Sequence, residues 1–171
     1  MKIYVLRHGE TDYNAEGKFQ GQVNTTLNEN GLRQANEAKN KLKDVKFDNV
    51  ISSPLIRAIK TANIVTDVEP IIDNRIIERS FGKLEGKYGI PDYEEKLEEY
   101  NIETYEGLCK RVYEFLEEII KKYIDKENIL IATHECIAQV IETYFNKKQN
   151  KDNWKEYRLK TGDYKKYEIG G

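Results

Sequence analysis

The chain has 171 residues, a formal net charge of −2, and charged side chains at 34% of its positions. This length fits a single domain that buries well over half of the surface of its unfolded chain. The near-neutral charge balance speaks against a protein that binds nucleic acid or a membrane surface. We therefore expect one domain over residues 1–171, with no nucleic-acid partner and no membrane partner.

Cysteine content and chain pattern indicate the compartment. Cys109 and Cys136 are the only two cysteines, and they form neither a spaced pair nor a metal pattern. Buried thiols in a reducing compartment are the default interpretation, which predicts a cytoplasmic protein. The first residues enter a predicted strand without a charged leader, and no apolar run approaches the ~20 residues of a membrane helix.

The first third of the chain alternates between apolar runs and amphipathic stretches. Residues 2–6 are apolar on both faces, which predicts a buried strand. Residues 9–30 are polar and rich in Gly, Asn and Thr, and loops of this length inside a small domain are usually functional. Apolar positions at helical spacing predict a helix over residues 30–44, and residues 47–53 carry a short strand.

A second helix is expected over residues 55–67. Ser53 is the predicted N-cap and Pro54 lies in the predicted first turn, both favoured at the start of a helix. Residues 70–73 fit a short strand. Residues 75–91 contain several glycines and are expected to be irregular.

The second half repeats the alternation. Residues 92–100 predict a weak, polar helix, and residues 104–124 predict a strong amphipathic helix. Residues 128–133 read as a second buried strand. Residues 135–146 are expected to form a helix that follows it directly.

The end of the chain and the overall alternation indicate the fold class. Residues 154–159 and 164–169 alternate in polarity around a turn and predict a closing hairpin. Strands alternating with helices predict an α/β fold, a three-layer α/β/α sandwich with a mostly parallel central sheet. Ligands of such sheets bind outside the carboxyl ends of the strands.

Both histidines of the chain follow predicted strands. Arg7 and His8 end the first strand, His134 ends the strand over 128–133, and Arg57 lies in a predicted first helical turn. Taken singly, a histidine at a strand end is more often structural, and Arg57 is most simply a surface residue. Together they bring two guanidinium groups, two imidazoles and two helix N-termini to one edge. Planar donors and helix N-termini favour the oxygens of a phosphoryl group.

The stretch LRHGETDYN at residues 6–14 closely resembles the signature of the histidine phosphatase superfamily, the phosphoglycerate mutase-like enzymes. Other stretches resemble further parts of the family pattern in the same order, at residues 19–35, 52–65, 75–86 and 129–137. The resemblance covers essentially the whole chain. It implies a phosphoglycerate mutase-like fold and places the chain in the small phosphatase branch.

The resemblance also implies catalytic roles. His8 would attack phosphorus and become phosphohistidine, which a neutral imidazole can do near its ordinary pKa. Arg7, Arg57 and His134 would hold the phosphoryl oxygens and stabilise the charge that spreads over them. Glu78 would protonate the leaving oxygen and then activate water, provided that burial raises its pKa.

Glu78 has a plainer interpretation, as a surface carboxylate paired with Arg79. Glu10 and Glu85 are nearby competitors for the role of the acid. The arginines supply the electrostatic stabilisation, and the histidines lack the partners of a zinc site, so we expect no metal and no cofactor. The expected substrate-binding residues are Thr11, Asn14, Gln20, Gly21 and Glu135.

Glu135 departs from the family pattern, which usually has glycine after the second histidine. Its carboxylate has three interpretations. It points away as a harmless first-turn residue, it selects a substrate with a positive group or a hydroxyl beside the phosphate, or it repels the phosphate and weakens catalysis.

The predicted cap insertion, at approximately residues 87–105, is short. A short cap suggests an open pocket that water enters, which favours hydrolysis over return of the phosphoryl group to a second substrate. The leading hypothesis is a metal-independent phosphomonoesterase of the histidine acid phosphatase type, with a small phosphorylated metabolite as its partner. The alternatives are a phosphoglycerate mutase-type phosphotransferase and a phospho-ligand-binding protein weakened by Glu135. The sequence leaves the oligomeric state open.

Overall fold

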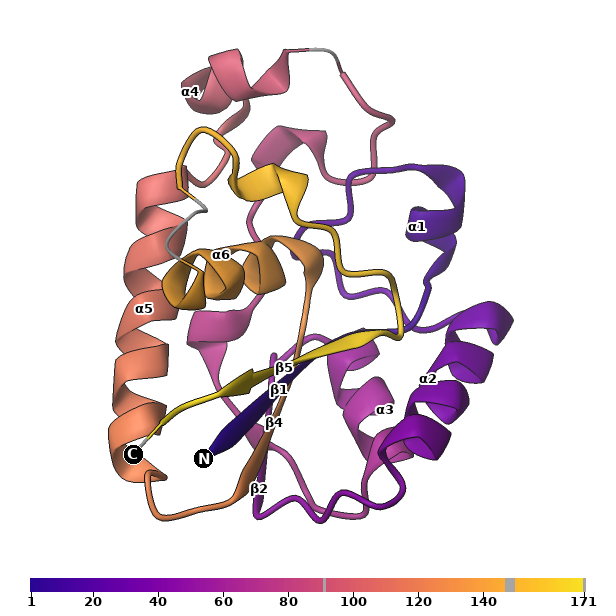
Figure 1. Ribbon diagram of the computed structural model, residues 1–171. Helices are drawn as coiled ribbons and strands as arrows, with labels where there is room; N and C mark the ends of the chain where they lie inside the picture. Colours follow the sequence, from indigo (N-terminus) through magenta and orange to yellow (C-terminus); the bar gives the residue numbers. More distant parts are fainter. Residues whose placement is uncertain (91, 147–149, 171) are drawn as a thin grey trace.

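The computed structural model describes residues 1–90, 92–146 and 150–170, and it has a central five-stranded sheet in the order β3-β2-β4-β1-β5 (Figure 1). The strands are β1 (Lys2–Arg7), β2 (Asn49–Ser52), β3 (Ile71–Ile72), β4 (Asn128–Thr133) and β5 (Tyr164–Glu168). All neighbours pair in parallel except β5, which runs antiparallel to β1. The sheet is therefore mostly parallel, as predicted.

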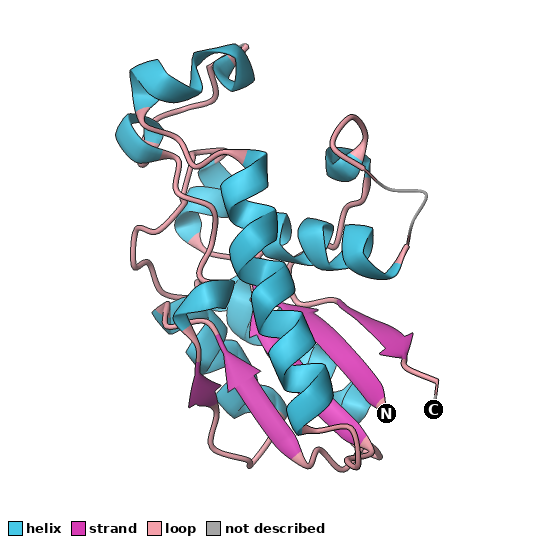
Figure 2. Ribbon diagram, turned by 90° about the vertical axis from the view of Figure 1, so that its left-hand side faces the viewer, coloured by secondary structure: helices cyan, strands magenta, loops and turns pink. Residues whose placement is uncertain are grey.

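Helices cover both faces of this sheet. The α-helices are α1 (Asp12–Glu16), α2 (Glu29–Leu42), α3 (Ile56–Val65), α4 (Leu97–Tyr100), α5 (Tyr105–Lys122) and α6 (Glu135–Phe145). The 3-10 turns are η1 (Asn74–Ile76), η2 (Gly82–Leu84), η3 (Tyr93–Lys96) and η4 (Trp154–Glu156). Figure 2 shows α5 crossing in front of the sheet.

Alternation along the strands builds two cores. In β1, Ile3 and Val5 pack with α5 and α6, whereas Tyr4 and Leu6 pack with α2 and α3 on the other face. Every residue of β4 is buried, because this central strand has helices on both faces. The result is the three-layer α/β/α sandwich that the sequence predicts.

Strand register places the two histidines side by side. β1 and β4 run parallel with Arg7 opposite Thr133, so His8 and His134 each follow a paired residue. The His8 amide donates a hydrogen bond to the Thr133 carbonyl at 3.0 Å. Both imidazoles therefore emerge at the carboxyl ends of adjacent strands, where ligands of parallel sheets bind.

The predicted closing hairpin is wrong. Residues 154–159 contain the η4 turn, and β5 pairs with β1 instead. This segment packs onto the rest of the domain. Trp154 is only 5% exposed, and its ring centroid lies 5.0 Å from that of Tyr105. Alternating polarity alone does not distinguish a strand from such a wrapped segment.

The predicted N-cap at Ser53 is also wrong. The helix α3 begins later, with Leu55 in the extended N-cap position and without a side-chain cap. The Ser53 hydroxyl accepts a hydrogen bond from the Leu55 amide and lies 2.6 Å from His134 Nε2. The Ser53 side chain therefore contacts His134 at the end of β4 and does not cap α3.

Two local features of the structure are not predicted by the sequence pattern. The long loop after β1 contains the short helix α1, with a capping box formed by Thr11 and Asn14. A five-residue helix is too short to show periodicity. In α2, Leu32 is 43% exposed, and the buried face instead includes Ala35 and Ala38.

A small apolar cluster forms the cap over the strand ends. Phe81, Leu84 and Ile102 are its buried centre, and Phe19 and Tyr93 pack against them. In Figure 1 the segment with α4 lies above the rest of the domain. Among the helices of the described segments, none combines the length and the apolar composition needed to cross a membrane.

Close backbone contact fixes the loop after β1 onto α2. A Cβ atom on Gly9 would lie 2.3 Å from the Gly31 carbonyl oxygen, and one on Gly31 would lie 2.1 Å from the Glu10 carbonyl oxygen. Such separations are far below van der Waals contact, so only glycine fits at both positions without a backbone shift. This contact holds the residues that follow His8.

We expect Gly31→Ala to lower the free energy of unfolding by roughly 2 kcal/mol, because the added methyl group forces two backbone segments apart. Urea denaturation followed by circular dichroism measures the change. Gly89→Ala is the matched control, since a Cβ atom there meets nothing within 4 Å. Equal stability of both variants would show that the two segments separate at little cost.

Candidate active site

His8 is held as a neutral base. Its side chain is 2% exposed, and Nδ1 lies 2.6 Å from the Gly9 carbonyl oxygen. A carbonyl only accepts, so Nδ1 carries the proton and Nε2 is unprotonated. The guanidinium Nε of Arg57 donates to that nitrogen at 3.2 Å. Burial, with Arg57 and Arg7 nearby, lowers the pKa of His8 well below its ordinary value.

Arg57 stands in the first turns of α3 and is fully buried. Its two terminal nitrogens donate to the carbonyl oxygens of Gly21 and Val23, both at 2.7 Å. Burial lowers the pKa of Arg57 to about 10, so the group is still a cation near neutral pH. Its hydrogen-bond partners are uncharged, and Glu78 is the main opposite charge near it.

His134 lies next to His8 at the N-cap of α6. The two ring centroids are 5.1 Å apart, and His134 Nε2 is 2.6 Å from the Ser53 hydroxyl. Burial and the neighbouring cations, Arg57 first, lower the pKa of His134 well below its ordinary value. Its Nδ1 atom is buried and has no hydrogen-bond partner within the described residues.

Arg7 flanks the pair from the end of β1. One terminal nitrogen donates to the Leu159 carbonyl at 2.8 Å, and the other lies 3.2 Å from a carboxylate oxygen of Glu135. Its Nε atom is buried and has no partner in the described segments. Two buried polar atoms on either side of His8 thus lack partners, which is typical of a site that binds a polar ligand.

Glu78 is a buried carboxyl group near these cations. It is 7% exposed, and its oxygens accept from the backbone amides of Arg79 at 2.8 Å and Cys136 at 3.4 Å. Burial raises its pKa, against the opposing effect of Arg57 and Arg7. A carboxyl with a raised pKa beside a neutral imidazole can exchange protons with a ligand.

The competing interpretations of the acid fit the structure less well. The Arg79 side chain forms its ion pair with Glu94, and only its backbone contacts Glu78. Glu10 accepts from the Asn28 amide, and Glu85 accepts from backbone amides near η2. Neither Glu10 nor Glu85 lines the cavity that contains His8.

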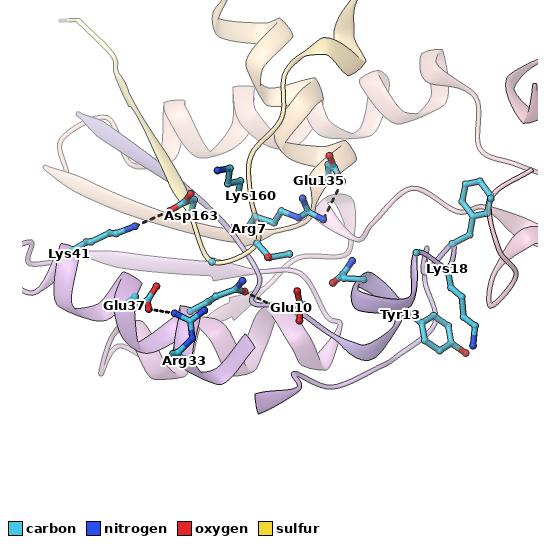
Figure 3. Close-up of a pocket in the computed structure, with 17 residues that line it drawn as sticks. Arg7, Glu10, Tyr13, Lys18, Arg33, Glu37, Lys41, Glu135, Lys160 and Asp163 are labelled. Carbon is cyan, nitrogen blue, oxygen red and sulfur yellow. Dashed lines mark hydrogen bonds and ion pairs between the residues drawn. The ribbon is translucent and has the colours of Figure 1, made fainter. Parts of the chain in front are cut away.

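A cavity of about 210 Å³ opens above His8. The sequence-predicted residues that line it are Arg7, His8, Asn14, Gln20, Gly21, Glu78 and Glu135. Arg57 and His134 do not line it, although Arg57 donates to His8 and the His134 ring lies next to that of His8. A larger groove of about 790 Å³ adjoins it and shares Arg7, Asn14 and Glu135 (Figure 3).

The predicted substrate-binding residues of the first loop have different positions. Asn14 and Gln20 line the cavity, whereas Thr11 is fully buried beneath them. The Thr11 hydroxyl lies 3.0 Å from the Asn14 side-chain oxygen and 2.5 Å from that of Gln20. With both oxygens engaged, the amide nitrogens are the ends available for a ligand. Thr11 thus supports binding residues rather than contacting a ligand.

Gly21 is required by the local backbone. Its φ of +50° lies in the left-handed region, and a Cβ atom would be 2.2 Å from a carboxylate oxygen of Glu85. The glycine carbonyl can therefore face Arg57. Its contribution is a backbone acceptor for the buried guanidinium.

Sequence reasoning missed Arg111, which holds the loop that carries Glu78. Arg111 on α5 donates to the carbonyls of Arg75 at 2.6 Å and Ile77 at 2.8 Å, and its guanidinium pairs with Glu103. The signal was available in part, because arginine is scarce in this lysine-rich chain. Nothing in the pattern of α5, however, identified its backbone partners.

The described residues contain no group of three or more His, Cys, Asp or Glu side chains arranged to hold a metal ion. This finding concerns protein ligands alone. The histidine nitrogens that do have partners contact a carbonyl, a guanidinium and a hydroxyl. The site presents a neutral imidazole, cationic donors and a carboxyl group with a raised pKa.

Comparison with known proteins agrees with this geometry. The family model of the histidine phosphatase superfamily (branch 1) matches residues 3–171. The uncharacterized phosphatase PhoE of Bacillus subtilis is 34% identical over 148 residues, covering 81% of this chain and 75% of that protein. The metal-independent phosphoserine phosphatase of Arabidopsis thaliana is 33% identical over 159 residues, 82% of this chain and 66% of that protein.

A solved structure gives the same result. The alpha-ribazole phosphatase from Shigella flexneri superposes with a TM-score of 0.85 at 27% identity, covering 99% of this chain and 91% of that chain. The match of the family model is nearly complete along the sequence. The chain belongs to the histidine phosphatase superfamily, branch 1, and its relatives include phosphatases.

Proposed function

We propose that the chain is a metal-independent phosphomonoesterase that hydrolyses a small phosphorylated metabolite through a phosphohistidine on His8. The observation that carries this proposal is the state of His8. Its imidazole is neutral, its Nε2 lone pair is free of a proton, and Arg57 lies against that same atom. A nucleophile prepared in this way beside cationic donors suits attack on phosphorus.

The first step forms the phosphoenzyme. The lone pair of His8 Nε2 gives up its hydrogen bond from Arg57 Nε and attacks phosphorus, and the bond from phosphorus to the ester oxygen breaks. The protonated carboxyl of Glu78 transfers its proton to the departing oxygen. Arg7, Arg57 and His134 stabilise the negative charge that spreads over the phosphoryl oxygens.

The second step releases phosphate. The Glu78 carboxylate now accepts a proton from a water molecule whose oxygen attacks phosphorus. The bond between phosphorus and Nε2 breaks, and its electrons return to the imidazole. Neutral His8 and protonated Glu78 are thereby restored, so the cycle consumes one ester and one water molecule.

Hydrolysis is the preferred outcome over transfer to a second substrate. The cavity adjoins a wide groove, which supports entry of water. A mutase would need a bisphosphorylated primer and would not release phosphate stoichiometrically. A protein that only binds phospho-ligands would leave the raised pKa of Glu78 without a use.

We expect phosphate release from at least one compound in a panel of phosphomonoesters that includes phosphoserine and alpha-ribazole phosphate. Release continues with a chelator present, because protein cations supply the electrostatic stabilisation. His8→Ala abolishes it, since no nucleophile remains. Colorimetric phosphate assays measure turnover, and thermal unfolding checks that the variant folds. Turnover by folded His8→Ala at the wild-type rate would rule out a phosphohistidine.

The loss of rate caused by Glu78→Gln should depend on the leaving group. With an alkyl phosphate we expect kcat to fall by roughly 100-fold, because the departing alkoxide needs a proton. p-Nitrophenolate leaves without needing a proton. With p-nitrophenyl phosphate we therefore expect only a small decrease in the rate of the initial burst, which reports phosphoenzyme formation. Glu10→Gln is the matched control, a nearby acid outside the cavity. An unchanged rate with the alkyl ester would show that another group is the acid.

The pH profile follows from the two pKa shifts. His8 has a lowered pKa, so the nucleophile stays neutral well below pH 6.5 and the acid limb of kcat/KM is displaced downward. Glu78 has a raised pKa and acts in its protonated form, so the rate with an alkyl phosphate falls as pH rises through that pKa.

Steady-state assays across pH with the wild type and Glu78→Gln test this profile. The basic limb should disappear in the variant, because glutamine does not titrate. A basic limb that persists unchanged in the variant would mean that another group, or the substrate itself, produces it.

A further inference from the structure

Glu135 lies between two arginines. One of its oxygens is 3.2 Å from a terminal nitrogen of Arg7, and the other accepts from Arg158 at 2.6 Å. Its side chain is 23% exposed, and it lines both the cavity above His8 and the adjoining groove. Figure 3 shows the carboxylate facing Arg7. The interpretation in which Glu135 points away from the site is therefore wrong.

The C-terminal segment and Glu135 together set the orientation of Arg7. The Leu159 carbonyl takes one terminal nitrogen at 2.8 Å and Glu135 takes the other. The buried Nε atom is left without a partner within the described segments. Since Arg158 precedes Leu159, one short stretch contacts both Arg7 and its carboxylate partner. Arg7 can thus offer Nε to a ligand while its plane stays fixed.

The carboxylate also creates an electrostatic conflict. Glu135 and Glu78 both line a cavity in which a phosphate dianion would lie. A negative side chain there repels the dianion, and more strongly than in bulk water. Arg158 pairs with Glu135 at the mouth of the same cavity, which it also lines, and 66% of its side chain is exposed. Its positive charge offsets that of the carboxylate without occupying the phosphoryl position.

We propose that Arg158 is a positioning residue that determines phosphate affinity indirectly, by pairing with Glu135 and keeping that carboxylate from repelling the bound dianion. This inference rests on the proposed function, because it assumes that the cavity above His8 binds a phosphoryl group. It assigns a defined purpose to an exposed arginine that contacts neither His8 nor Glu78. It also explains how a carboxylate is tolerated beside Arg7.

A double-mutant cycle tests the proposal. We expect Arg158→Met to weaken vanadate binding roughly three- to fivefold, the range of a partly exposed ion pair. KM should rise by a similar factor while kcat changes little, since the chemical step does not involve Arg158. In a Glu135→Gln background the same change should have a clearly smaller effect, because Arg158 then has no carboxylate to hold and only its direct attraction for the dianion is lost. Calorimetric titration with vanadate and steady-state kinetics provide the two readouts.

Two further variants sharpen the test. Arg158→Lys keeps the charge and should restore most of the affinity, which a purely geometric role would not allow. Lys151→Met is the control, because Lys151 is as exposed as Arg158 and pairs with Glu106, and neither residue lines the cavity or the groove. Raising the salt concentration should shrink the Arg158→Met effect, since exposed charges are screened.

The outcomes separate this inference from the proposed function. Equal losses from Arg158→Met with and without Glu135 would mean that Arg158 contacts the ligand directly, which overturns the indirect role. Unchanged vanadate affinity of Arg158→Met in both backgrounds would exclude a role for Arg158 in binding. Vanadate binding without turnover of any ester by the wild type would contradict the phosphatase proposal, yet the binding cycle would still decide the role of Arg158.

Discussion

The burial of Arg57 is the constraint on which the site depends. A guanidinium without solvent access costs much free energy unless its donors have partners. Those partners are the carbonyls of Gly21 and Val23 and the Nε2 atom of His8. The loop after α1 must therefore wrap over the strand ends, and the unprotonated Nε2 of His8 must face Arg57. One buried cation thus organises both the loop conformation and the tautomer of the His8 imidazole.

Two acids stand near this cation cluster, and their surroundings give them opposite character. Glu78 accepts two backbone amides in a buried position, and burial raises its pKa. Glu135 lies between two guanidinium groups at the cavity wall. A group whose neutral form is favoured can donate a proton, whereas an ion-paired carboxylate serves as a counterion. Environment rather than residue type separates the two roles.

Sequence reasoning predicted the layers and the meeting of His8 with His134, because both depend on local periodicity and on parallel strands in register. It did not predict that residues 154–159 would wrap onto the domain. It also gave Ser53 the wrong role and left the direction of Glu135 open. These features depend on contacts between distant segments: Ser53 with His134, and Glu135 with Arg158. Periodicity carries no information about such partners.

The two ends of the chain build the site together. The Gly162 amide lies 3.1 Å from the carbonyls of both Arg7 and His8, and the Arg7 amide donates to the Asp163 carbonyl at 3.0 Å. The backbone of the first motif is thus held by the segment that leads into β5. The same segment carries Leu159 and Arg158 to the side chains of Arg7 and Glu135. Residues far outside the recognisable motifs therefore fix the backbone of the first motif and the orientation of its arginine, so the geometry of the site depends on the C-terminal segment as much as on the motif itself.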